Sequence, residues 1–130
     1  MDALNPAAEF DYSPRVRELF ADLRHAGALA GAAHAIVSAQ AGSREQGASV
    51  CLQMAFAGDG IQAVRYRAYG CPHFLAACES LARWLEGRTR AELGQWRWRD
   101  VEAELGVPTA KRARLLLLED ALREMRDRST

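Results

Sequence analysis

The chain has 130 residues, 49% of them hydrophobic, and its 17 basic and 17 acidic residues cancel to a formal net charge of zero. This size and composition favour one globular domain over residues 1–130, and the charge balance gives no basic field for binding nucleic acid. The sequence has no signal-peptide pattern at its start and no apolar run of membrane-spanning length, so we expect a cytoplasmic protein that binds neither nucleic acid nor membrane.

The N-terminal part is predicted to hold one helix and one strand. Residues 1–13 form a loose lead-in. A helix follows over residues 13–27, "SPRVRELFADLRHAG", because its first serine can cap the helix and Pro14 suits the first turn. "HAIVSAQ", residues 34–40, predicts a first strand, and the Gly- and Ser-rich residues 41–47 predict a loop.

Two further strands are predicted from an alternating pattern of apolar and polar residues. Residues 48–56, "ASVCLQMAF", place Val50, Leu52, Met54 and Phe56 on one face and Cys51, Gln53 and Ala55 on the other. "AGDG" is a hairpin turn, and residues 61–69 form the return strand. Three short strands joined by turns predict an antiparallel sheet with one face to bury.

The remaining chain is predicted to be helical, because the apolar period changes from two to 3.6 after Gly70. Residues 72–87 form an amphipathic helix, and Thr89 begins a capping box. Asp100 can cap a short helix, and Thr109 starts a long one whose inner stripe is Leu115, Leu118, Leu122 and Met125. The fold class is therefore α+β, with helices packed on one face of a three-stranded antiparallel sheet in the order helix-β-β-β-helices.

Cys71 is the strongest candidate for chemistry. It follows Gly70 at a strand-to-helix junction, where free backbone N–H groups and the helix dipole favour a thiolate, although a half-buried structural cysteine would fit as well. His73 could share a ligand with Cys71 or polarise its thiolate, and the alternative is a surface histidine. Cys78 lies on the apolar helical stripe and Cys51 on a strand face, so we expect both to be structural.

Other candidate residues give weaker signals. His34 has no visible partner and is assigned no role. Trp96 and Trp98 alternate with arginines, which could indicate base stacking, but packing between short helices is the favoured interpretation. The sequence has no phosphate loop, carboxylate pair or Ser/His/Asp arrangement, so we expect no enzyme. A thiol enzyme that uses Cys71 with His73 is a third alternative.

Several stretches resemble the U-type iron–sulfur cluster assembly scaffold family, which includes the NifU N-terminal domain, IscU and SufU. The resemblance runs from Tyr12 to about Met125. It is most specific in "RYRAYGCP" with "AACESLARWLEGRTRAEL", and in "LGVPTAKRARLLLLEDAL". It implies the α+β fold described above and a role in cluster assembly.

The resemblance also implies a ligand set of three cysteines and one aspartate that holds zinc or a nascent [2Fe–2S] cluster. Cys71 matches the central cysteine, with Gly70 before it, and Lys111 matches the lysine of the last segment. The other ligand positions are occupied by Gln46, Ala48 and Arg114.

The resemblance therefore implies a scaffold-like protein in which most ligands are replaced and which relies on Cys71, with His73 as a weak candidate for a second metal ligand. Its cargo would be a [2Fe–2S] cluster, iron or zinc. Its partners would be a cysteine desulfurase and cluster-acceptor proteins, and it could form a homodimer. The alternative is a relative that binds no metal and acts as a binding or regulatory module for the assembly partners.

Overall fold

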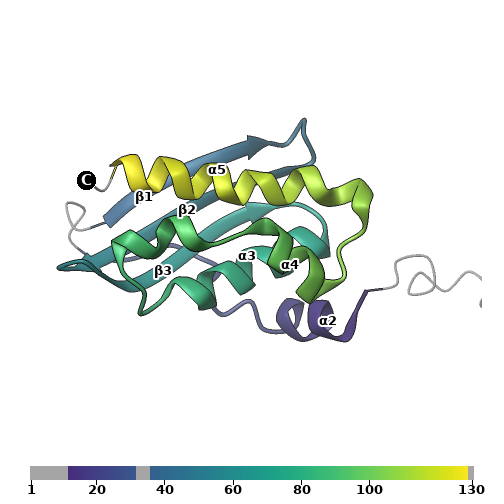
Figure 1. Ribbon diagram of the computed structural model, residues 1–130, viewed down its shortest axis with the longest axis horizontal. Coiled ribbons are helices and arrows are strands. Elements are labelled where there is room, and N and C mark those ends of the chain that lie inside the picture. The colour runs from purple at the N-terminus through teal and green to yellow at the C-terminus, as the bar shows by residue number, and fades with distance from the viewer. Residues whose placement is uncertain (1–11, 32–35, 129–130) are drawn as a thin grey trace, which may run out of the picture.

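The computed structural model describes residues 12–31 and 36–128, and Figure 1 shows how their elements are arranged. The order is one helix, three strands and then helices, which confirms the predicted α+β class. The elements are α2 (Pro14–Phe20), β1 (Ile36–Ser43), β2 (Ala48–Ala57), β3 (Gly60–Tyr69), α3 (Pro72–Leu85), the 3-10 helix η2 (Arg90–Gln95), α4 (Trp98–Leu105), the 3-10 turn η3 (Thr109–Lys111) and α5 (Arg112–Arg128). Within the described residues, no helix has both the length and the apolar character needed to cross a bilayer.

The three strands form one antiparallel sheet in the order β1-β2-β3. The predicted alternation is confirmed in β2, where Val50, Leu52 and Met54 are buried and the residues between them are half-buried. A register shift between Ala55 and Phe56 leaves Phe56 only partly buried at the end of the strand. One face of the sheet therefore carries the core.

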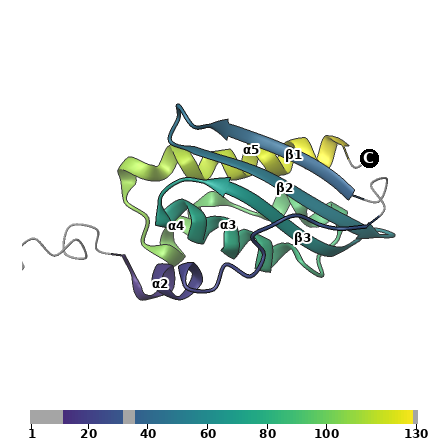
Figure 2. The same ribbon diagram turned by 180° about the vertical axis from the view of Figure 1, so that it is seen from behind.

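The helices cover that face. α5 packs across β1 and β2, and α3 packs against β3. Figures 1 and 2 show this layered arrangement from its two sides. The predicted inner stripe of α5 is confirmed, because its four members are buried: Leu115, Leu118, Leu122 and Met125. Trp96 is also buried, as packing predicted.

The N-terminal predictions need correction. Ser13 caps α2 as predicted, but the helix ends at Phe20 and does not continue to residue 27. The chain then runs along β3 instead. The N–H of Tyr66 donates to the carbonyl of His25 at 3.0 Å, and the carbonyl of Tyr66 accepts the N–H of Gly27 at 2.8 Å. β1 continues to Ser43, so the predicted loop shortens to residues 44–47. His34 and residues 1–11 of the lead-in lie outside the described residues.

Two predicted helix starts also need correction. Asp100 does not cap α4, because the helix begins earlier and has Arg97 at its N-cap. The N–H of Trp98 donates to a carboxylate oxygen of Glu119 on α5 at 2.8 Å. The capping box of Thr89 with Glu92 is confirmed, although the segment is a 3-10 helix. Thr109 likewise begins a 3-10 turn, after which α5 starts.

Candidate functional site

Cys71 lies at the junction between β3 and α3, as predicted, and it is the N-cap residue of α3. The thiol is half-buried. Gly70 lets the strand pass close to the helix, because an ideal Cβ at that position would lie 2.8 Å from the ring of Phe74. The junction therefore holds Cys71 at the open first turn of a helix, with its sulfur partly accessible.

Cationic groups and a backbone N–H surround the Cys71 sulfur. Nη1 of Arg114, from the first turns of α5, donates to Sγ at 3.5 Å. Burial favours the neutral thiol, but the N–H of Phe74, the charge of Lys111 and the hydrogen bond from Arg114 outweigh it and lower the pKa of Cys71. The site therefore favours the thiolate form of Cys71 more than solvent does.

His73 stands beside this thiol, but the surface interpretation of this residue is wrong. It is 5% exposed, and its ring packs on Tyr12 with ring centroids 4.7 Å apart. Its Nδ1 lies 3.4 Å from Nζ of Lys111. Burial and the charge of Lys111 lower the pKa of His73, so the ring is neutral and accepts from the ammonium. Nε2 has no hydrogen-bond partner within the part of the chain that the structure describes.

Arg114 also contacts the loop between β1 and β2. Gly47 adopts φ +83, and an ideal Cβ there would lie 3.0 Å from Nη2 of Arg114. Gln46 is exposed and donates its N–H to the carbonyl of Ser43 at 3.2 Å, whereas Ala48 is fully buried. One guanidinium thus lies between Cys71 and the loop that carries Gln46 and Ala48.

The donor set that the described residues place around Cys71 does not by itself fit a metal ion or a cluster. No group of three or more His, Cys, Asp or Glu side chains is arranged to hold a metal within the described residues. Zinc takes about four ligands and iron–sulfur clusters take thiolates, whereas here an arginine and a lysine approach the single thiol. Fixed positive charge next to the sulfur opposes a cation.

The other two cysteines lie elsewhere, as predicted. Cys78 is 2% exposed on the inner stripe of α3, and burial raises the pKa of its thiol far above the ordinary value. Cys51 is half-buried on the outward face of β2, opposite Arg67 in the register. Neither joins the group formed by Cys71, His73, Lys111 and Arg114.

Sequence reasoning missed a buried polar cluster further along α3, at Glu79 and Glu86. Nδ1 of His25 lies 2.6 Å from Glu79, and Nε2 lies 2.9 Å from Glu86. Tyr66 and Arg83 also donate to Glu79, at 2.9 and 2.8 Å. The partners of His25 are 54 and 61 residues away in sequence, so no local signal could have revealed them. The cluster fastens the segment after α2 to the sheet and to α3.

Comparison with known proteins agrees with this geometry. The chain is 36% identical over 114 residues to the bifunctional protein NifU/MnmA of Rubrobacter xylanophilus, an alignment that covers 85% of this chain. The chain spans about a quarter of that relative, since the same alignment covers 23% of its length.

Two solved structures share the fold. A putative iron–sulfur cluster assembly scaffold protein for the SUF system from Fervidobacterium islandicum superposes with a TM-score of 0.72 at 16% identity, covering 92% of this chain and 98% of that one. A nitrogen-fixing NifU-like protein (N-terminal) from Brucella abortus gives a TM-score of 0.69 at 19% identity, covering 89% and 92%. The profile of the NifU-like N terminal domain matches residues 11–125, so the chain belongs to that family.

Proposed function

We propose that the protein is an iron–sulfur cluster assembly protein of the scaffold type that works through Cys71 as an acceptor of sulfane sulfur. Membership of the NifU-like family supports the assembly role. The observation that carries the proposal is the half-buried Cys71 thiol at a helix start, with the Arg114 guanidinium on its sulfur. Such surroundings favour a thiolate, which is the nucleophilic form of cysteine.

The proposed step is a transfer of sulfur between two thiols. The Cys71 thiolate attacks the terminal sulfur of a persulfide on a donor protein, for which a cysteine desulfurase is the expected class. A new S–S bond forms at Cys71, the S–S bond of the donor breaks, and the donor cysteine leaves as a thiolate. No net oxidation occurs. Arg114 and Lys111 then stabilise the anionic persulfide on Cys71 by their charges.

Iron or a [2Fe–2S] cluster is cargo in this proposal. Because the described residues around Cys71 supply one thiol and two cations, such cargo needs ligands besides these residues. Cys71 of a second copy, in a homodimer, or an added small thiol could provide them. Cluster-acceptor proteins would then be downstream partners.

The deciding experiment incubates the reduced protein with a cysteine desulfurase and free cysteine under anaerobic conditions. Mass spectrometry under non-reducing conditions should find a gain of one sulfur atom on the peptide that contains Cys71. The matched control is Cys51→Ser, which should still accept sulfur, whereas Cys71→Ser should not. An unmodified Cys71, or equal labelling of the Cys71→Ser variant, would refute the acceptor role.

A second candidate function is a docking module that binds assembly partners without carrying sulfur or metal. The observation that favours it is Arg114 at a position where the family resemblance implies a cysteine. The two candidates differ in what they require of Cys71. A docking module should capture desulfurase or acceptor proteins and take up no sulfur at Cys71, and its Cys71→Ser variant should capture them as well as wild type does. The metal and acid-labile sulfide content of anaerobically purified protein tells both candidates apart from a scaffold that already carries a cluster.

A further inference from the structure

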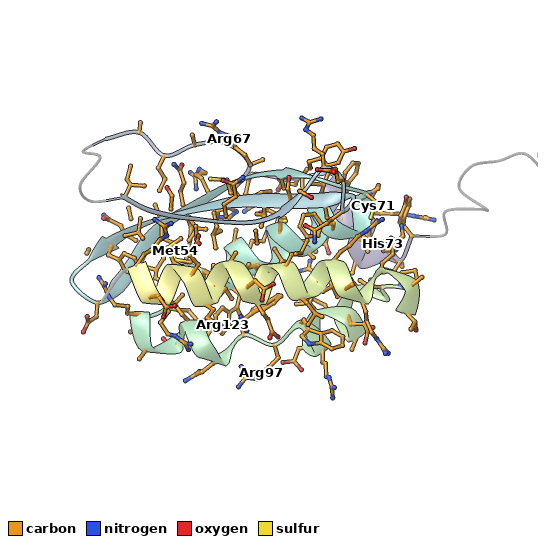
Figure 3. The ribbon with its side chains drawn as sticks, turned by 90° about the horizontal axis from the view of Figure 1, so that it is seen from above. Met54, Arg67, Cys71, His73, Arg97 and Arg123 are labelled. Atoms are coloured by element: carbon orange, nitrogen blue, oxygen red, sulfur yellow. The ribbon has the colours of Figure 1, made fainter. Side chains whose placement is uncertain are left out.

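A small pocket lined by arginines lies at the opposite end of α5 from Cys71. It has a volume of about 150 Å³ and is formed between η2, the residues that follow it, and α5. Arg114 and Arg126 are 12 positions apart on one helix, so these two residues lie roughly 18 Å apart along its axis. Figure 3 shows Cys71 and His73 near the start of α5, and Arg97 and Arg123 on the side of the helix that faces away from the sheet.

The floor of this pocket is fixed by the core, because Leu93, Trp96 and Leu122 are all buried. Apolar side chains that are locked by packing give the pocket a constant shape. The main chain of η2 also makes room for a cation. An ideal Cβ at Gly94 would lie 2.9 Å from Nη1 of Arg126, so that guanidinium lies directly against the glycine.

Three exposed arginines line the rim, namely Arg97, Arg123 and Arg126. Nη1 of Arg97 donates to the carbonyl of Gly94, and also to that of Trp96 at 3.2 Å. These bonds orient the guanidinium and leave its other N–H groups for a ligand. Arg123 pairs at 3.1 Å with Asp120, but both side chains are more than half exposed, so this pair is weak.

One carboxylate, that of Glu119, also lines the pocket. One of its oxygens accepts the N–H of Trp98 at the start of α4, so Glu119 already has a structural partner. Basic side chains outnumber acidic ones around the cavity, since three arginines line it with Glu119, and Asp120 pairs with Arg123 beside it.

We propose that this pocket binds the phosphate group of a small phosphorylated molecule. A phosphate group is anionic at neutral pH and has three acceptor oxygens, which match the several guanidinium donors that line the pocket. A carboxylate has two acceptor oxygens and matches these donors less well. Arginine forks bind such oxyanions in two-pronged geometry. The site is independent of Cys71, and it goes beyond the proposed sulfur transfer.

Isothermal titration with inorganic phosphate tests the proposal on the intact chain, with sodium chloride of equal ionic strength as the reference. We expect saturable binding that sulfate, another tetrahedral dianion, displaces. Arg97→Gln and Arg123→Gln should each weaken it about tenfold, since each removes charge-assisted hydrogen bonds. The matched control is Arg67→Gln, which removes an exposed arginine on β3 and should bind phosphate as wild type does.

Further titrations identify the source of the phosphate group and distinguish phosphate binding from the proposed sulfur transfer at Cys71. A nucleoside monophosphate that binds more tightly than phosphate would indicate an organic ligand; equal affinity would indicate the free ion, and both support the site. Cys71→Ser should retain binding whether or not it accepts sulfur. Heats that match sodium chloride, equal loss in Arg67→Gln, or binding of a glutamate-rich peptide without binding of phosphate would each overturn the proposal.

Discussion

Arg114 donates to the sulfur of Cys71 at 3.5 Å, so a guanidinium of α5 is in direct contact with the thiol at the junction between β3 and α3. The family resemblance implies a cysteine at position 114, where this chain has a cation. Its effect on Cys71 is electrostatic: together with the N–H of Phe74 and the charge of Lys111, it lowers the pKa of the thiol against the effect of burial.

Arg114→Gln should raise the pKa of Cys71, because it removes one of the groups that stabilise the thiolate. The fraction of thiolate at neutral pH then falls. The measurement is the rate of alkylation of Cys71 against pH in a Cys51→Ser background, and its midpoint should move to higher pH. Arg67→Gln serves as the charge-matched control and should leave the midpoint in place. An identical profile for Arg114→Gln and wild type would show that the contact does not act on the thiol.

Restoring the implied ligands should create a metal site. We expect the triple variant Gln46→Cys, Ala48→Asp and Arg114→Cys to bind about one zinc ion per chain, since it restores with Cys71 the four ligands that the family resemblance implies. Wild type should bind none stably. The matched control has Gln46→Ser, Ala48→Asp and Arg114→Ser. It keeps side chains of similar size without the added thiols and should remain metal-free. Zinc released from the purified proteins and detected by a chromogenic chelator measures the difference.

Glu79 should make the stability of the fold depend on acid. Burial would raise its pKa, but hydrogen bonds from Arg83, His25 and Tyr66 outweigh burial and hold it below 4.5. Because the pKa is lower in the folded state, the carboxylate stabilises the fold fully above the unfolded value, and this stabilisation is lost as pH falls through the folded pKa. Glu79→Gln should cost about 2 to 4 kcal/mol at neutral pH.

Denaturant unfolding of both proteins over a pH series measures this effect. The free energy of unfolding of wild type should decline below pH 4.5 more steeply than that of Glu79→Gln. Asp120→Asn, which changes an exposed residue in a surface ion pair, is the control and should follow wild type. Parallel curves for Glu79→Gln and wild type would exclude Glu79 as the titrating group.

Gly70→Ala should destabilise the fold and disturb Cys71 together. The added methyl group would lie 2.8 Å from the buried ring of Phe74, so either the ring or the junction must move. Overpacking of this kind costs about 1 to 3 kcal/mol. Gly60→Ala is the matched control, because its added Cβ would make an ordinary 3.4 Å contact with the carbonyl oxygen of Ala57. Thermal unfolding and Cys71 alkylation together detect the change, and equal effects of the two substitutions would contradict it.

The sheet could be predicted from the sequence because its signals are local. The alternation in residues 48–56 predicted which side chains of β2 face the core. The segment "AGDG" predicted the hairpin, whose turn residues are Gly58, with φ +62, and Asp59. The end of the first helix could not be predicted in this way. Residues 25–27 continue the helical pattern, but their backbone groups bond to Tyr66 of β3, and this tertiary pairing overrides local propensity.

The same distinction applies to the site. Gly-Cys before an apolar helical stripe identified Cys71 correctly as a residue at a strand-to-helix junction. The burial of His73 depends on the ring of Tyr12 and on Lys111, which approach from both ends of the chain. Likewise the start of α4 depends on Glu119, whose carboxylate accepts the N–H of Trp98 although the two residues are 21 positions apart. Contacts between distant segments decide such features, and no short window of sequence contains them.

The close approach of Gly47 to Arg114 couples two segments that meet only in the folded chain. Because the guanidinium lies where any side chain at position 47 would begin, a substitution in the loop and one at the start of α5 should not have additive effects on stability. Because Gly47 also adopts φ +83, a side chain there strains the backbone whether or not Arg114 is present. Shortening Arg114 would therefore relieve only the steric part of the cost of replacing Gly47, and the loop would still require glycine.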